Sequence, residues 1–331
     1  LLDGAARLKR GKKTPLVDTL IKKNMPAVAI TDHGNMYGAY TLYKQCKNKG
    51  IKPIIGCEFY TCSNMRERTG RNGEFNHLVL LAKNDIGYKN LVKLDSLAFT
   101  EGFYYKPRID IEFLKEHSEG LICLSACLAG KIPQYILNNE YEKAKEYALM
   151  LKGMFDEGDF YIEIQNHGIA DEIKVLPYLV KLAREIGVKL VATNDCHYLE
   201  KKDAEMHDVL LCVQTGKTYD DPNRMRFEGN EFYLKDYDEM YELFKDYPES
   251  LETPFEIMDK CNVTIKKEDL MPPYEPDDKS KPADYLRKIA FEGLEKRYGT
   301  ITKEIEERAE YELSIIIRMG FAEYYLIVWD F

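Results

Sequence analysis

The sequence predicts an α/β fold in which parallel strands are joined by crossover helices. Short apolar runs recur along the chain, and segments with helical periodicity lie between most of them. Most runs lead into His, Asp, Glu or Cys residues, and in parallel α/β barrels the functional residues gather at the carboxyl ends of the strands. The chain has 331 residues, of which 45% are hydrophobic and 31% charged, so it is long enough for more than one domain.

Six apolar runs are the predicted strands of this sheet. Five of them lead directly into polar residues or residues with metal-binding side chains. The third run is the exception, because His77 stands before its apolar residues rather than after them. The predicted strands cover residues 26–30, 52–56, 78–81, 121–124, 160–162 and 189–193.

Three helices are predicted between these strands, over residues 36–49, 141–155 and 172–186. A glycine follows the first two closely, and Gly187 directly follows the third. Glycine just beyond a periodic segment is typical of a helix end, because it adopts the left-handed conformation there without steric cost.

The character of the chain changes after Cys261. Residues 271–279 are rich in proline and acidic residues, as in a linker, and residues 301–331 carry apolar residues at helical spacing. We therefore expect a barrel domain over 1–262, a linker over 263–285 and the start of a second domain over 286–331. The chain begins without Met and stops within an apolar run, so we expect it to belong to a longer protein.

The net charge of −9 repels polyphosphate, so any contact with nucleic acid must be local. Two basic stretches qualify, although solvated surface charge is the favoured explanation of both. The eight cysteines are spread along the chain, which suits reduced thiols in the cytoplasm, and no apolar run approaches the roughly 20 residues of a membrane span. The basic residues are Arg7, Lys9, Arg10, Lys12, Lys13, Lys22 and Lys23 in the first stretch, and Arg66, Arg68 and Arg71 in the second.

Residues with metal-binding side chains stand beside several predicted strand ends. His33, His77 and His197 are three of the six histidines, and Asp32 and Asp195 precede two of them. Imidazole nitrogens and carboxylate oxygens are ligands of Zn²⁺, Mn²⁺ and Fe²⁺. Glu58 and Cys127 stand at two further strand ends. Each of these residues alone is more often a structural polar residue or a small buried one, and only the joint pattern predicts a multinuclear metal site.

The stretches at residues 32–35 and 194–197 resemble those of the polymerase and histidinol phosphatase (PHP) superfamily. Residues 1–6, 29–38, 54–58, 103–108, 124–130 and 318–331 resemble the N-terminal region of the bacterial DNA polymerase III alpha family. The resemblance implies a distorted seven-stranded PHP barrel followed by the helical start of a polymerase palm domain. It also implies up to three divalent ions, Zn, Mn or Fe, in the barrel.

Residue by residue, the resemblance implies a ligand set and a group of catalytic residues. A His-x-His pair of the family is expected just before Leu1. Within the chain, Asp195, His197 and His33 are expected to be catalytic and Arg108 to bind substrate. His167 is expected either to bind substrate or to support a metal ligand. His117 and His207 are expected at the surface. The implied metal ligands are Asp3, His33, Glu58, His77, Cys127, Asp195 and His197.

Clustered divalent ions catalyse phosphoester hydrolysis. The resemblance implies a 3′-5′ proofreading exonuclease acting on the 3′ end of DNA, within a cytoplasmic replicative polymerase that binds primer-template, the sliding clamp and other replisome subunits. Polymerisation itself would use Mg²⁺ in a palm site that we expect downstream of residue 331. The alternatives are a non-catalytic scaffold that docks a separate exonuclease subunit and, less favoured because of the linker, a free-standing phosphatase of the histidinol-phosphate type.

Overall fold

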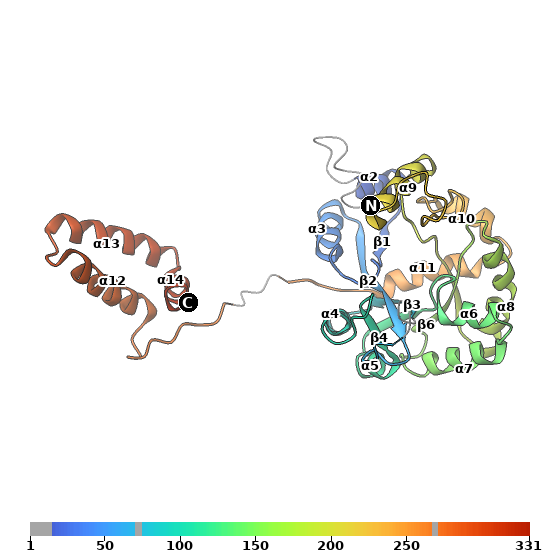
Figure 1. The fold of residues 1–331 in the computed structure, drawn as a ribbon, viewed down its shortest axis with the longest axis horizontal. Coiled ribbons are helices and arrows are strands. Elements are labelled where there is room, and N and C mark those ends of the chain that lie inside the picture. Colours follow the sequence, from blue (N-terminus) through green and yellow to red (C-terminus); the bar gives the residue numbers. More distant parts are fainter. Residues whose placement is uncertain (1–14, 70–74, 267–270) are drawn as a thin grey trace. The chain divides into compact units, whose positions relative to one another are not determined.

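The computed structural model describes residues 15–69, 75–266 and 271–331 of the chain (Figure 1). Asp3, the basic residues between 7 and 13, and Arg71 lie outside the described residues. The chain divides into two compact units, Leu1–Ile265 and Lys266–Phe331. We describe each unit by itself.

The larger unit is built on one curled seven-stranded sheet. Its strand order is β1-β2-β3-β5-β6-β7, and β4 pairs with the carboxyl end of β2. Helices lie around the outside of the sheet (Figure 1). The α/β barrel class predicted above is confirmed. The strands are β1 (Ala27–Ile30), β2 (Lys52–Cys62), β3 (Asn76–Ala82), β4 (Arg108–Asp110), β5 (Leu121–Leu124), β6 (Phe160–Ile164) and β7 (Lys189–Ala192).

The prediction that all strands are parallel is wrong for β3. This strand runs antiparallel to both β2 and β5, and it places His77 opposite Tyr60. An apolar run carries no mark of its direction, so the sequence pattern could not reveal the reversal. The reversal explains why His77 precedes its strand, because the amino end of an antiparallel strand lies at the same sheet edge as the carboxyl ends of its parallel neighbours.

Two hydrophobic layers pack against the two faces of the sheet. The outer layer, which includes Phe59, Leu80 and Ile162, packs against the surrounding helices. The inner layer includes Val79 and Tyr161, with the buried residues Ile54, Leu124 and Val191. Successive residues of a strand face opposite sides, so the residues that continue the inner face toward the site edge are Glu58 on β2, His77 on β3 and Glu163 on β6.

The three predicted helices form, with shifted ends. The first begins at Ala39 rather than at residue 36, because two side chains bind the backbone amides before it. The Asn35 side chain accepts a hydrogen bond from the Tyr37 amide, and the Asp32 carboxylate accepts a hydrogen bond from the Gly38 amide. The helices of this unit are α2 (Pro15–Lys22), α3 (Ala39–Lys49), α4 (Asp85–Thr100), α5 (Ile111–Glu116), α6 (Lys131–Leu137), α7 (Tyr141–Lys152), α8 (Ala170–Ile186), the 3₁₀ turn η1 (Lys201–Asp203), α9 (Ala204–Thr215), α10 (Tyr237–Phe244) and α11 (Glu249–Lys260).

The smaller unit consists of α12 (Pro282–Tyr298), α13 (Lys303–Arg318) and α14 (Ala322–Asp330). Its core contains Leu286, Leu313 and Leu326, and an Arg287–Glu310 ion pair joins α12 to α13 at 2.6 Å. No helix among the described residues is long and apolar enough to cross a membrane.

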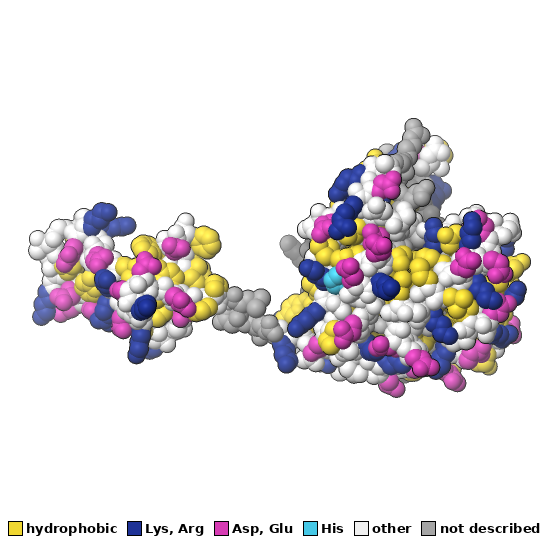
Figure 2. Space-filling view, turned by 90° about the horizontal axis from the view of Figure 1, so that it is seen from below, with side chains coloured by type: hydrophobic (Ala, Val, Ile, Leu, Met, Phe, Trp, Pro, Cys, Tyr) yellow, Lys and Arg dark blue, Asp and Glu magenta, His cyan; other side chains and the backbone are white. Residues whose placement is uncertain are grey.

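Positive and negative side chains are interspersed over the face of the larger unit in Figure 2, with hydrophobic side chains between them.

Candidate metal centre

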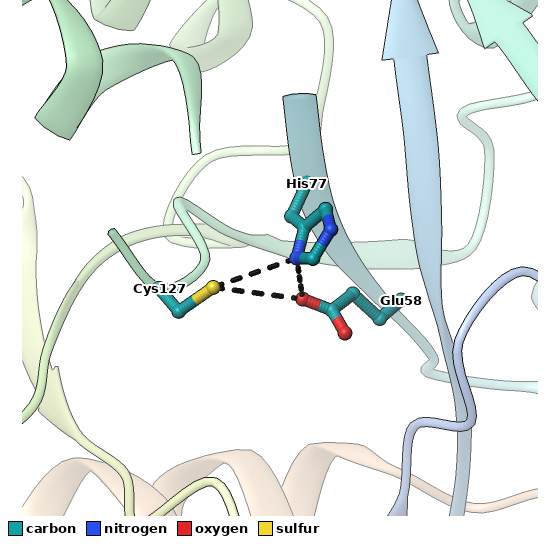
Figure 3. A group of neighbouring side chains, drawn as sticks. All are labelled: Glu58, His77 and Cys127. Atoms are coloured by element: carbon teal, nitrogen blue, oxygen red, sulfur yellow. Dashed lines mark hydrogen bonds and ion pairs between the residues drawn. The ribbon is translucent and has the colours of Figure 1, made fainter. Parts of the chain in front are cut away.

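Three of the predicted ligand residues converge at the inner edge of the sheet (Figure 3). The Glu58 Oε1 atom lies 2.6 Å from His77 Nδ1 and 3.8 Å from Cys127 Sγ. The Cys127 Sγ and His77 Nδ1 atoms are 3.5 Å apart. Their donor atoms all lie within 4.8 Å of one another, which is close enough to surround a single ion. Glu58 comes from β2, His77 from β3 and Cys127 from the loop after β5.

Three further predicted ligands adjoin this group. The other Glu58 oxygen, Oε2, contacts His33 Nδ1, and the His33 Nε2 and His197 Nε2 atoms are 3.4 Å apart. The His197 Nδ1 atom lies 2.8 Å from the Asp195 carbonyl oxygen and 3.7 Å from its carboxylate. Six of the seven implied ligands are therefore close neighbours. The seventh, Asp3, lies outside the described residues.

The electrostatic balance of the group favours a cation. Burial alone would raise the pKa of Glu58, but the hydrogen bonds with His33 and His77 outweigh it and lower the pKa to about 2. Burial, followed by the Glu58 and Asp195 carboxylates, raises the pKa of the Cys127 thiol well above its ordinary range. The thiolate is the form that binds metals, and a nearby divalent cation stabilises it.

His167 supports the site from behind. Its Nδ1 atom lies 2.8 Å from Glu172 Oε1, and its Nε2 atom lies 2.9 Å from the Asn194 carbonyl oxygen. Asn194 precedes Asp195, whose backbone φ of +40° is a strained conformation for a residue other than glycine. The ring also stacks on Phe232 at 4.0 Å between centroids. His167 is thus placed to hold the loop of Asp195 in position.

His167 and Arg108, which the family resemblance implies as substrate-binding residues, are both buried in the structure. Both residues are 3% exposed. The Arg108 guanidinium donates to the carbonyl oxygens of Glu67 at 2.7 Å and Gly102 at 3.3 Å. The polar groups of both side chains therefore form hydrogen bonds within the protein. Sequence alone did not reveal this, because the partners of both side chains are set by the fold.

The structure also shows residues that sequence reasoning missed. His207 was expected at the surface, but it is half-buried and its ring centroid lies 5.4 Å from that of His197. Glu163 is buried and lines the same cavity as Glu58 and Asp195. The sequence contains one indication of this position. Glu163 is an acidic residue two positions after Tyr161 on a buried strand, and this spacing places both side chains on the inner face. His117 is half-buried against Phe113, at a 4.5 Å centroid separation.

The donor set fits divalent metal ions. Glu58 offers two oxygens toward two imidazoles, and carboxylate, imidazole and thiolate together match the preferences of Zn²⁺ and related ions. Ring nitrogens that face one another at 3.4 Å, as in His33 and His197, place two metal-ligating atoms side by side.

Comparison with known proteins agrees with this geometry. The PHP domain family matches residues 1–167, and the family described as bacterial DNA polymerase III alpha NTPase domain matches residues 284–331. Proteins named DNA polymerase III subunit alpha are similar over the whole chain. Those of Borreliella burgdorferi, Treponema pallidum and Helicobacter pylori are 47%, 46% and 40% identical.

The chain spans 28% to 29% of the length of these three relatives. The match to the PHP domain covers about half of the chain and includes the strands that carry Glu58 and His77. The chain belongs to the bacterial DNA polymerase III alpha family, and its larger unit contains a PHP domain.

Proposed function

We propose that the larger unit is a metal-dependent phosphodiesterase that removes nucleotides from the 3′ end of single-stranded DNA. The observation that carries this proposal is the convergence of Glu58, His77 and Cys127 at one edge of the sheet, with His33 and His197 beside them. A carboxylate held between two imidazoles beside a thiol, without a Lys or Arg partner among the described residues, is suited to bind divalent cations.

The residues divide into two adjoining groups. Glu58 Oε1, His77 and Cys127 would hold one ion, and His33, Asp195 and His197 would hold a second and face the scissile phosphate. Divalent ions in such clusters stabilise charge on phosphate oxygens and make water a better nucleophile near neutral pH. The cluster takes up to three ions of Zn, Mn or Fe in this proposal. His167 keeps Asp195 in place through the Asn194 carbonyl oxygen.

Basic groups of the larger unit would meet the DNA backbone. Arg66 is exposed and pairs with Glu101 at 2.8 Å, and Arg68 donates to the Glu101 carbonyl oxygen at 3.1 Å. Lys106 lies over the Tyr60 ring at 5.2 Å, and that ring packs edge-on against His77 at 5.3 Å between centroids. Aromatic rings beside cationic side chains are typical of single-strand binding surfaces.

The test is metal analysis together with hydrolysis of a 3′-labelled single-stranded oligonucleotide. We expect the 331-residue chain to retain divalent ions and to release mononucleotides in Mn²⁺, and His33→Ala and Asp195→Ala to abolish release. Lys143→Ala, on the outer helix α7, is the matched control and should cleave at the parental rate. Cleavage that continues unchanged in both site variants would show that the nuclease lies elsewhere.

A second candidate is a docking module for a separate exonuclease. Helix α9 favours it, because an apolar stripe along this helix is exposed in the part of the chain that the structure describes. The exposed residues of this stripe are Met206, Val209, Leu210 and Val213. A chain that binds ions but leaves single-stranded DNA intact would support this docking function over the phosphodiesterase.

We further propose that the chain works within a DNA-directed DNA polymerase of DNA replication in the cytoplasm. In that setting its partners would be primer-template DNA, the sliding clamp and other replisome subunits, and Mg²⁺ would serve polymerisation. The smaller unit would be the start of the palm domain. The support is the similarity of the whole chain to proteins named DNA polymerase III subunit alpha.

A further inference from the structure

We propose that Glu163 is an additional acidic residue of the metal centre, and that its Oε2 atom contributes to binding a divalent cation in the cavity. Glu163 is not among the ligands implied by the family resemblance. The proposal rests on the proposed function, because it assumes that the cavity binds divalent ions.

The position of Glu163 follows from strand alternation. Tyr161 packs in the inner hydrophobic layer, and Glu163 lies two residues further along β6 on the same face. It pairs with Val191 of β7 in the sheet register, and its amide donates to Ser125 Oγ at 2.8 Å. The residue is 4% exposed. It lines a cavity of about 600 Å³ together with Glu58, Cys127 and Asp195.

The two oxygens of Glu163 have different surroundings. Oε1 accepts hydrogen bonds from the Gln165 side-chain amide at 3.0 Å and from the Thr193 hydroxyl. Oε2 is buried and has no hydrogen-bond partner among the described residues. The two donors on Oε1 fix the orientation of the carboxylate, so Oε2 is held in place without a protein partner. A buried polar atom of this kind is unfavourable unless a ligand, ion or water satisfies it.

The charges around Glu163 favour a cation as the missing partner. Its nearest ionisable neighbours include Asp195 and Glu58, and no Lys or Arg forms an ion pair with it among the described residues. Burial, with smaller contributions from these carboxylates, raises the pKa of Glu163 to about 7. A divalent cation in the cavity supplies the positive charge that the three carboxylates lack. An anionic or neutral ligand would leave the repulsion between them in place.

The experiment is a calorimetric titration of the metal-free 331-residue chain with Mn²⁺ alone. Glu163→Gln keeps the size of the side chain and an oxygen for Gln165 and Thr193, but it places an amide group toward the cavity. We expect the dissociation constant for Mn²⁺ to rise roughly 10- to 100-fold, as for other residues that support metal ligands. Glu256→Gln is the matched control, because Glu256 lies on α11, accepts a hydrogen bond from Tyr161 and does not line the cavity.

The outcomes separate the two proposals. Thermal unfolding in EDTA should show that Glu163→Gln is folded, and Glu163→Asp, which withdraws the carboxylate by one methylene, repeats the test if it is not. Parental Mn²⁺ affinity in the folded Glu163 variant would overturn this inference and leave the proposed function standing. A parent chain that binds no Mn²⁺ would overturn the proposed function, and this inference with it.

Discussion

Two groups of buried or half-buried carboxylates in the larger unit differ in the basic side chains that contact them. In the first, the lysine-paired cluster, Asp159 pairs with Lys83 and with Lys260 at 3.2 Å, and Glu256 pairs with Lys260 at 3.0 Å and with Lys189. In the second, the metal centre, the basic side chains that contact Glu58 among the described residues are the imidazoles of His33 and His77.

The difference separates structural carboxylates from binding ones. The fold supplies a lysine for each carboxylate of the lysine-paired cluster, so these ion pairs are complete within the protein. No Lys or Arg pairs with Glu58, Glu163 or Asp195 among the described residues. Buried charges are tolerated when they are paired or when they coordinate metals. Under the proposed function, a bound cation supplies the positive charge that no Lys or Arg of the described residues brings to the metal centre.

The largest expected effect is on metal affinity. Glu58→Gln removes the carboxylate that faces both His33 and His77, so we expect Mn²⁺ affinity to fall by more than the roughly 10- to 100-fold that supporting residues contribute. Calorimetric titration measures it. Asp159→Asn is the control and should bind Mn²⁺ as the parent does. Equal losses in both variants would remove the distinction between the two clusters.

The second effect is stabilisation by the bound ion. Mn²⁺ at 100 times its dissociation constant should raise the free energy of unfolding of the larger unit by about 2.7 kcal/mol, because it binds the folded state. Urea unfolding with and without Mn²⁺ measures the increase. The increase should persist in Asp159→Asn and disappear in Glu58→Gln. A Mn²⁺ effect of equal size in Glu58→Gln would place the ion at another site.

The third effect is on stability without metal. Asp159→Asn leaves Lys83 and Lys260 without their buried partner, and we expect it to lower the free energy of unfolding in EDTA by about 1–3 kcal/mol. Glu58→Gln should lower it by less, because His33 and His77 can become neutral and a glutamine side chain can still form hydrogen bonds with both rings, whereas Lys83 and Lys260 remain charged. Urea unfolding of both variants in EDTA provides the comparison. A larger loss in Glu58→Gln would show that its charge is structural.

The smallest effect is the pH dependence of the lysine-paired cluster. Burial opposes ionisation of Glu256, but the hydrogen bonds with Lys189, Lys260 and Tyr161 lower its pKa from 4.5 to about 2. Its contribution to stability is therefore complete above pH 4.5 and disappears as the pH falls toward 2. The stability difference between the parent and Glu256→Gln should shrink over that range. A difference that stays constant from pH 6 to pH 3 would contradict it.

The sequence pattern predicted the alternation of strands and helices, because hydrophobic periodicity reports which residues are buried. It did not predict the direction of β3, since an apolar run such as residues 78–81 is the same in either direction. Helix ends shifted where side chains competed for backbone groups, as Asp32 and Asn35 do before α3.

The implied ligands came from family motifs, and their convergence appears only in the fold. His33 and His197 are 164 residues apart in the chain and meet because β1 and β7 both deliver residues to the same cavity. The sequence pattern did not identify Glu163 as a site residue, because a single acidic residue after a short apolar run is consistent with many structural roles. The burial of His167 depends on Glu172 and Asn194, which no local pattern connects to it.

The most direct test of the account is anomalous X-ray diffraction from crystals of the chain grown with Zn²⁺. We expect an anomalous peak between Glu58, His77 and Cys127, with ligand distances of roughly 2.0 to 2.3 Å. We expect no peak at the lysine-paired cluster, where Lys83 and Lys260 already neutralise Asp159. Zinc bound at Asp159 or Glu256, with no peak at Glu58, would contradict it.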